Sequence, residues 1–356
     1  MIPILFDSTE TLFDTNGVCR LSDSISCLVT EERNGIYECD FEYPVDGAYF
    51  DEIRCGRIIA CTHEDSVDVQ PFDIVGYSRP INGVVKFHAT HISYRQKEIV
   101  ARGSSISTLS AAFDMLKSSA SPSNPFKYET DLASSTINMG AADGIPRTVR
   151  QLLGGVEGSI LDTWGGEYQW DKWTVRLLNN RGNEKDFAIR YGVNMIDYNE
   201  DIDYSETYSA VFPFWSSGED DDRTIVLGGR VDSGMETYSG RNICVPLDLS
   251  DKFETAPTAS DLRDFASAYM RTKQVNLPKQ NISVDFIRLQ DSEEFSQYAE
   301  LLQCKLCDYI PVIFPWYGVQ GRYKIVKTVY NVLTDRYESM ELGDLSMSLS
   351  EALGLN

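Results

Sequence analysis

Strict two-residue alternation between apolar and polar side chains is the feature that most constrains this fold. Residues 36–43 place Tyr37, Cys39, Phe41 and Tyr43 on one face and mainly acids on the other. This pattern is typical of an antiparallel strand with one solvated face. Asn-Gly pairs, which favour tight hairpin turns, punctuate the same region at Asn16-Gly17, Asn34-Gly35 and Asn82-Gly83. Residues 1–100 are therefore predicted to form a small barrel or sandwich of short strands.

The last part of the chain repeats this pattern. Residues 323–332 and 336–342 are predicted to form a hairpin, as are residues 72–77 and 84–94 in the first region, and residues 282–289 also alternate. The two hairpins agree in pattern but not in residue identity. A duplication of one β unit and an accidental likeness therefore both remain open.

The middle of the chain changes to a helical pattern. Residues 107–116 and 148–163 carry apolar side chains at helical spacing, and Pro146 suits the start of the second helix. A hairpin is predicted over residues 167–178, and a capped helix over 258–270.

These patterns predict an α+β chain that is mostly β, with two related β-barrel-like domains flanking an inserted α/β region. The first barrel-like domain is predicted to cover residues 1–104 and the inserted α+β domain residues 105–190. A region of irregular β structure with one helix follows over residues 191–280. The second barrel-like domain is predicted to cover residues 281–356, with contributions from about 191–210.

The charge balance excludes several classes of function. The chain has 54 acidic and 32 basic side chains and a formal net charge of −22. General nucleic-acid binders and proteins that dock on anionic membranes need clustered Lys and Arg instead. No segment approaches the roughly 20 apolar residues of a membrane span. The N-terminus also lacks the pattern of a signal peptide, so we expect synthesis in a cytosol.

Eight cysteines and three histidines are the soft metal ligands of the chain. Cys304 and Cys307 form its C-x-x-C pair, but a zinc site usually needs a second pair of ligands at matched spacing. His63 is distant in sequence, and strand alternation places His88 and His91 on opposite faces. The remaining cysteines are scattered: Cys19, Cys27, Cys39, Cys55, Cys61 and Cys244. We predict reduced thiols, buried or half-buried in strands, and no catalytic, cofactor-binding or metal-binding residue.

Clustered acids suggest a calcium site as an alternative. A Ca²⁺ loop needs ordered D-x-D-x-D-G spacing, which these clusters lack. They are the run Glu219–Asp222 and the acids Asp197, Glu200, Asp201 and Asp203. We therefore predict solvated positions for them.

A second alternative is an enzyme. Glu167 and Asp171 flank Trp170, as acids and aromatic platforms do in glycosidases. Hydrolysis of the host cell wall is thus the alternative function, although a strand hairpin explains the same residues more simply.

Several phrases, in order along the chain, resemble the phage tail-protein family known as prophage endopeptidase tail or minor structural proteins, which includes tail-associated lysins. The middle phrase is LLGGVEGSILD, followed by GGE and WD, over residues 152–171. In LCDYIPV, residues 306–312, Cys307 stands where the family usually has Gly. The other phrases are residues 21–44, 70–74, 91–94, 181–182, 189–195 and 341–343. The resemblance covers about residues 1–345.

The resemblance implies a structural, non-enzymatic hub of a phage tail tip or baseplate, similar to the hubs of contractile tails. Such hubs are homotrimers in which each subunit gives two tube-ring domains to a pseudo-sixfold ring. The implied partners are distal tail or tail-tube proteins, tip or receptor-binding proteins, and DNA that passes through without specific binding. The implied location is the virion tail tip, after synthesis in the bacterial host cytoplasm. Lytic domains of the family follow the hub, so peptidase residues are not expected before Asn356.

The −22 charge acquires a specific interpretation in a ring through which DNA passes. An acidic lumen would repel phosphates. This hypothesis requires that the acids cluster on strands and loops that face the channel.

Overall fold

The computed structural model describes residues 1–62, 68–193, 195–218, 223–234, 240–253, 255–273, 275, 279–286 and 304–343. The chain divides into two compact units, one formed by Met1–Asn199 with Ile282–Asn356 and the other by Glu200–Asn281. The predicted class, α+β and mostly β, is confirmed. The finer division into four domains stays a prediction.

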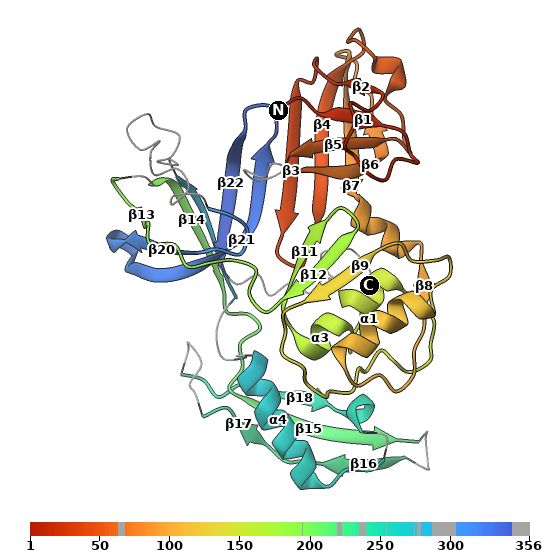
Figure 1. The fold of residues 1–356 in the computed structure, drawn as a ribbon. Coiled ribbons are helices and arrows are strands. Elements are labelled where there is room, and N and C mark those ends of the chain that lie inside the picture. Colours follow the sequence, from red (N-terminus) through yellow and green to blue (C-terminus); the bar gives the residue numbers. More distant parts are fainter. Residues whose placement is uncertain are drawn as a thin grey trace. The chain divides into compact units, whose positions relative to one another are not determined.

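A long sheet forms the frame of the first unit (Figure 1). Its strands from the first region are β1 (Ile4–Phe6), β2 (Cys19–Arg20), β3 (Ser26–Glu32), β4 (Tyr37–Pro44), β5 (Ile58–Thr62), β6 (Val69–Ser78) and β7 (Val84–His91). Its later strands are β13 (Ile189–Arg190), β14 (Met195–Asp203), β19 (Lys279–Phe286), β20 (Tyr309–Phe314), β21 (Val319–Asn331) and β22 (Arg336–Gly343). The strand order is β14-β19-β22-β21-β3-β4-β7-β6-β5-β1-β2, and β20 pairs with both β13 and β21.

The two ends of the chain therefore share one sheet. β21 pairs antiparallel with β3 from Lys327 opposite Glu32 to Asn331 opposite Leu28. In Figure 1 the blue strands β21 and β22 lie beside the red and orange strands β3 and β4. Pairing between such distant segments joins the first and last β regions directly.

The hairpins predicted over residues 72–94 and 323–342 are confirmed, with one shorter strand, and the turn signal at Asn34-Gly35 also joins two paired strands. β3–β4, β6–β7 and β21–β22 are antiparallel pairs, and Asn34, Gly83 and Asp335 adopt positive φ in their turns. The predicted strand 84–94 was wrong at its end, because β7 stops at His91 and a 3-10 helix, η2 (Ile92–Lys97), follows. The His91 ring accepts the backbone N–H of Ser93 and so stabilises this turn.

The inserted region combines helices with a small sheet. Its elements are β8 (Val100–Ala101), α1 (Leu109–Ser118), β9 (Lys127–Thr130), β10 (Arg147–Thr148), α2 (Val149–Gly154), α3 (Ile160–Trp164), β11 (Glu167–Asp171) and β12 (Thr174–Leu178). The helix predicted over 107–116 and the hairpin predicted over 167–178 are confirmed.

The single helix predicted over 148–163 was wrong. Gly155 ends α2, and Ser159 caps the start of α3 by accepting the N–H of Asp162. Gly158 lies between them with φ 71°, and the backbone of Gly140 packs against it. A left-handed residue cannot continue a helix, so the apolar stripe bends into two short helices.

The first unit has two main hydrophobic cores. One contains buried side chains of the first β region and of the inserted region together, including Phe41, Phe72, Leu152 and Tyr168. The other lies under β20–β22 and contains the side chains Cys304, Leu306, Cys307, Ile310, Val312, Phe314, Ile325, Met340 and Leu342 with Ile189.

The second unit is a small sheet with one helix. Its strands are β15 (Ala210–Ser217), β16 (Thr224–Leu227), β17 (Val231–Asp232) and β18 (Cys244–Asp248). The predicted helix 258–270 is confirmed as α4 (Ala259–Lys273), and Thr258 and Asp261 exchange hydrogen bonds at its start. Leu262 and Ala266 of α4 pack into small cores with Trp215 and Val211 of β15.

Candidate functional site

Glu167 and Asp171, the pair considered for hydrolysis, are both engaged in ion pairs and hydrogen bonds within the fold. The Glu167 side chain is only 7% exposed and is held by Lys324, by Arg33 at 3.5 Å and by the N–H of Arg181 at 2.8 Å. Burial raises the pKa of the Glu167 carboxyl, but these donors outweigh burial and the pKa is lowered. A general acid needs a raised pKa instead.

Asp171 and Trp170 also have structural roles. Asp171 accepts hydrogen bonds from Arg176 at 3.0 Å and from Gln70 at 3.2 Å. The Trp170 ring is buried, stacks on Tyr168 and is covered by the Arg150 guanidinium, so it offers no platform to a sugar. Residues four apart on a strand lie about 13 Å apart, beyond the usual separation of glycosidase carboxyls.

Glu167 belongs to a buried ionic junction within the first unit. We define this junction as three acid–base pairs: Glu167 with Lys324, Glu31 with Arg181, and Asp308 with Lys185. Arg181 binds both carboxylate oxygens of Glu31, at 2.6 and 3.2 Å, and Lys185 lies 3.1 Å from Asp308. The pairs join β3, β11 and β21 to residues 181–185 and 308, and so fix how these segments meet. Sequence alternation did not reveal the junction, because its partners are far apart in sequence.

In the part of the chain that the structure describes, His88, His91 and the C-x-x-C cysteines do not converge on one site. His88 is partly exposed and lies 2.8 Å from Asp40, whereas His91 is buried and stacks on Tyr37, which confirms that they occupy opposite faces. His63 lies outside the described residues. Cys304 and Cys307 are both buried in the second core, and burial raises the pKa of Cys307 to about 12.

The structure describes one of the two acidic clusters. Asp197, Asp201 and Asp203 are exposed on β14, as predicted, whereas Glu200 is half-buried. The run Glu219–Asp222 lies outside the described residues.

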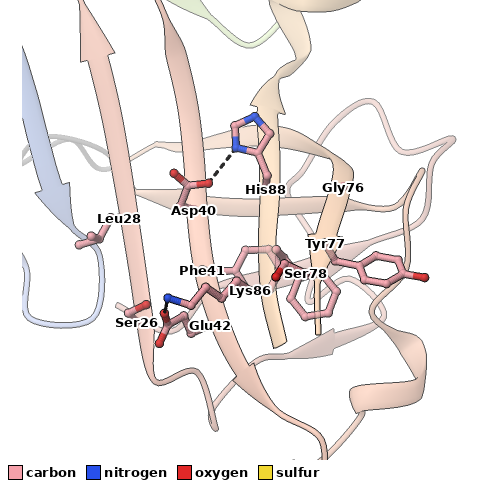
Figure 2. Close-up of a pocket in the computed structure, with 11 residues that line it drawn as sticks. Ser26, Leu28, Asp40, Phe41, Glu42, Gly76, Tyr77, Ser78, Lys86 and His88 are labelled. Atoms are coloured by element: carbon pink, nitrogen blue, oxygen red, sulfur yellow. Dashed lines mark hydrogen bonds and ion pairs between the residues drawn. The ribbon is translucent and has the colours of Figure 1, made fainter. Parts of the chain in front are cut away.

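Strands β4 and β7 share a polar face in the first β region. It carries a shallow groove of about 480 Å³ lined by Ser26, Leu28, Asp40, Phe41, Glu42, Gly76, Tyr77, Ser78, Lys86, Phe87 and His88. Figure 2 shows two cross-strand contacts in it, a hydrogen bond between Asp40 and His88 and an ion pair between Glu42 and Lys86, each at 2.8 Å. Glu38 lies on the same face of β4, 4.0 Å from His88. Alternation placed these acids on a solvated face, and acids and bases lie directly opposite each other there.

The chain is similar in fold to several solved phage tail proteins. A prophage tail protein from Listeria monocytogenes EGD-e matches with a TM-score of 0.60 and 15% identity, covering 99% of this chain and 98% of that one. A tail protein from Neisseria meningitidis MC58 matches with a TM-score of 0.59 and 11% identity over 99% and 98% of the two chains. A prophage tail protein from Shewanella oneidensis matches with a TM-score of 0.57 and 12% identity over 96% and 98%.

The chain has the fold of these phage tail proteins. The resemblance predicted from the sequence phrases is thus confirmed at the level of fold, over nearly the whole of both chains. No protein-family model matches the sequence, and no curated protein matches it. Within the described residues, no helix has both the length and the apolar character that a membrane crossing requires.

Proposed function

We propose that this chain is a structural subunit of a phage tail, acting as the hub of the tail tip or baseplate. The observation that carries the proposal is the fold match with three tail proteins over at least 96% of each chain. A match over whole chains includes the inserted region as well as the β regions. It therefore supports a common role more strongly than a match over one barrel would.

The proposed assembly is a homotrimeric ring with pseudo-sixfold symmetry, which joins the tail tube to the tip. Two β regions per subunit, residues 21–43 with 70–94 and residues 306–342, would supply six similar wall segments. The direct pairing of β3 with β21 supports this plan, because it joins the two regions into one continuous wall.

The proposed role is not enzymatic. Its partners would be distal tail or tail-tube proteins and tip or receptor-binding proteins, and DNA would pass without specific binding. The burial and ion pairing of Glu167 support this, since the best sequence candidate for a catalytic acid is committed to Lys324 and Arg33. The protein would work at the virion tail tip after synthesis in the host cytoplasm.

Electron microscopy of the purified full chain tests the assembly. We expect ring-shaped particles with threefold symmetry and the mass of three chains, alone or with a tail-tube protein present. Particles of one chain under both conditions would contradict the ring.

Zymography on peptidoglycan tests the absence of catalysis. We expect no clearing by the full chain. Clearing that is lost on Glu167→Gln in a folded variant would establish a hydrolase and overturn the structural role.

A further inference from the structure

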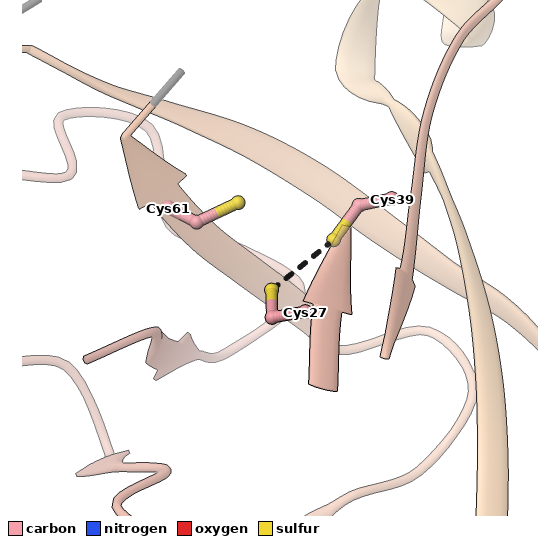
Figure 3. Close-up of side chains that lie close together, drawn as sticks. All are labelled: Cys27, Cys39 and Cys61. Carbon is pink, nitrogen blue, oxygen red and sulfur yellow. Dashed lines mark hydrogen bonds between the residues drawn. The ribbon is translucent and has the colours of Figure 1, made fainter. Parts of the chain in front are cut away.

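Three cysteine sulfurs converge in the core of the first β region. Cys27 lies on β3, Cys39 on β4 and Cys61 on β5, and each is fully buried. The sulfurs of Cys27 and Cys39 are 3.7 Å apart, and all three sulfurs lie within 4.8 Å of one another. Figure 3 shows the three side chains pointing toward a common centre.

The convergence is a product of tertiary structure. β3 and β4 are neighbours, but β7 and β6 lie between β4 and β5 in the sheet. The sheet therefore curls until β5 brings Cys61 to the sulfurs of β3 and β4. Within the described residues, this is the one place where three or more Cys, His, Asp or Glu donor atoms meet at metal-binding distances.

The spacing suits a metal ion better than a disulfide. Three thiolates at about 2.3 Å from one central ion lie about 4.0 Å from each other, whereas a disulfide needs about 2.05 Å. Cys27 lies opposite Phe41 and Cys39 opposite Val29, so the two cysteines are diagonal rather than directly paired. Small side-chain movements, in which the Cys27 and Cys39 sulfurs separate from 3.7 to about 4.0 Å, would complete a trigonal set of ligands.

We propose that Cys27, Cys39 and Cys61 bind one soft, thiophilic d¹⁰ metal ion, Zn²⁺ or Cu⁺, inside the first β region. Thiolate-only ligand sets select such ions. Each bound thiol releases its proton to solvent, so the ion and the three sulfurs form a closed unit that ties β3, β4 and β5 together. A divalent ion leaves less negative charge in the core, whereas a monovalent ion accepts three ligands more readily.

The metal ion must bind while the chain folds, because the three thiols are not accessible to solvent in the folded chain. The test therefore refolds the full chain without oxygen, with equimolar Zn²⁺ in one arm and Cu⁺ in the other. A Cys55→Ser, Cys244→Ser background removes the two exposed thiols, which would bind metal non-specifically. Bound metal after desalting is measured by mass spectrometry, and the unfolding temperature is measured in parallel.

We expect about one ion per chain in at least one arm and an unfolding temperature raised by about 5 °C or more. Cys39→Val should abolish both effects. Cys19→Val, which removes a buried cysteine outside the cluster, should retain them.

Three results would overturn the proposal. The first is a metal content below about 0.1 ions per chain in both arms, and the second is a metal content in Cys39→Val equal to that of the background protein. The third is a disulfide between Cys27 and Cys39 in the native protein. If Cys39→Val does not fold by circular dichroism, Cys61→Ala replaces it, and the metal content of the background protein still decides the question.

Discussion

Buried charged residues explain much of how the first unit holds together. Glu167 is the clearest case, because its carboxylate meets Lys324, Arg33 and a backbone N–H in a position almost closed to water. Removing one partner of such a pair leaves the other charge buried without compensation. Glu167 therefore stabilises the fold, and it does so only while its carboxyl group is ionised.

Glu167→Gln should lower the free energy of unfolding by about 3 kcal/mol at pH 7, because Lys324 loses its counter-charge. Denaturant unfolding measures this loss. The matched control is Glu129→Gln, which breaks the exposed pair with Arg176 at 2.9 Å and should cost less than about 0.5 kcal/mol. Equal losses in both variants would show that burial of the Glu167 pair adds nothing.

The loss should also depend on pH. The pKa of Glu167 is lower in the folded chain than the value of about 4.3 expected on unfolding. Its stabilising contribution is therefore fully present above that unfolded value and is lost as the pH falls through the folded pKa. The difference between the wild type and Glu167→Gln should shrink in acid, which unfolding curves from pH 7 to pH 3 would measure.

Arg150 is buried in a different setting. Its guanidinium lies 4.2 Å from the centre of the Trp170 ring and 5.1 Å from that of Tyr94. Its Nη2 donates to the Gly35 carbonyl at 3.5 Å, and among the described residues its Nε and Nη1 atoms have no hydrogen-bond partner. Burial lowers the pKa of Arg150 to about 10. The aromatic rings thus replace hydrogen bonds as its main partners.

Arg150→Met should leave the free energy of unfolding within about 1 kcal/mol of the wild type, because an apolar chain of similar length fills the space without a desolvation cost. Arg150→Ala should lose about 3 kcal/mol, because it leaves a cavity beside Trp170. Thermal or denaturant unfolding distinguishes the two variants. If Arg150→Met lost as much free energy of unfolding as Arg150→Ala, the charge itself would stabilise the fold.

At the scale of elements, glycines decide where helices end. The apolar stripe of residues 148–163 suits one helix, but Gly158 interrupts it with φ 71° and lies against Gly140. The two glycine backbones approach so closely that a methyl group at Gly158 would lie 2.7 Å from the Gly140 Cα. The packing of the Gly158 backbone against Gly140 therefore decides the conformation of this segment, although its apolar spacing favours a helix.

Gly158→Ala should destabilise the protein by about 3 kcal/mol, from left-handed strain together with the collision. Gly144→Ala is the matched control, since Gly144 has φ 88° but no atom of the described residues within 4 Å of an added methyl group. It should cost only about 1 kcal/mol. Equal losses in denaturant unfolding would remove the collision as a cause.

For the whole molecule, the distribution of charge bears on the proposed channel. The polar face of β4 carries Glu38, Asp40 and Glu42, and two of these acids meet bases across the strand pair. An excess of acids on a lumen wall would keep DNA phosphates away from it. We hypothesise that this face lines the proposed lumen.

Changing Glu38, Asp40 and Glu42 to Lys should make the assembled ring retain DNA, with an affinity that falls steeply as salt rises. The control changes Asp197, Asp201 and Asp203 on β14 to Lys, which alters net charge equally on another strand. Fluorescence anisotropy with duplex DNA measures both. Similar binding by both variants would contradict a lumen at β4, and the charge of the chain would then serve only solubility.

The sequence by itself determined the local structure where one residue pattern dominates. Alternation and Asn-Gly turns predicted strand β4, the turn at Asn34-Gly35 and the β6–β7 hairpin, because side-chain direction and turn geometry are local properties. It also predicted that His88 and His91 face opposite ways. Ordered phrases along the chain predicted the phage tail fold, which the structural matches confirm.

Only the tertiary structure decided what distant residues do together. It paired β21 with β3, committed Glu167 to Lys324 across 157 positions, and brought Cys61 to Cys27 and Cys39. It also divided the predicted helix 148–163 through the contact of Gly158 with Gly140. Each outcome depends on packing between segments far apart in the chain, and local periodicity carries no record of such contacts.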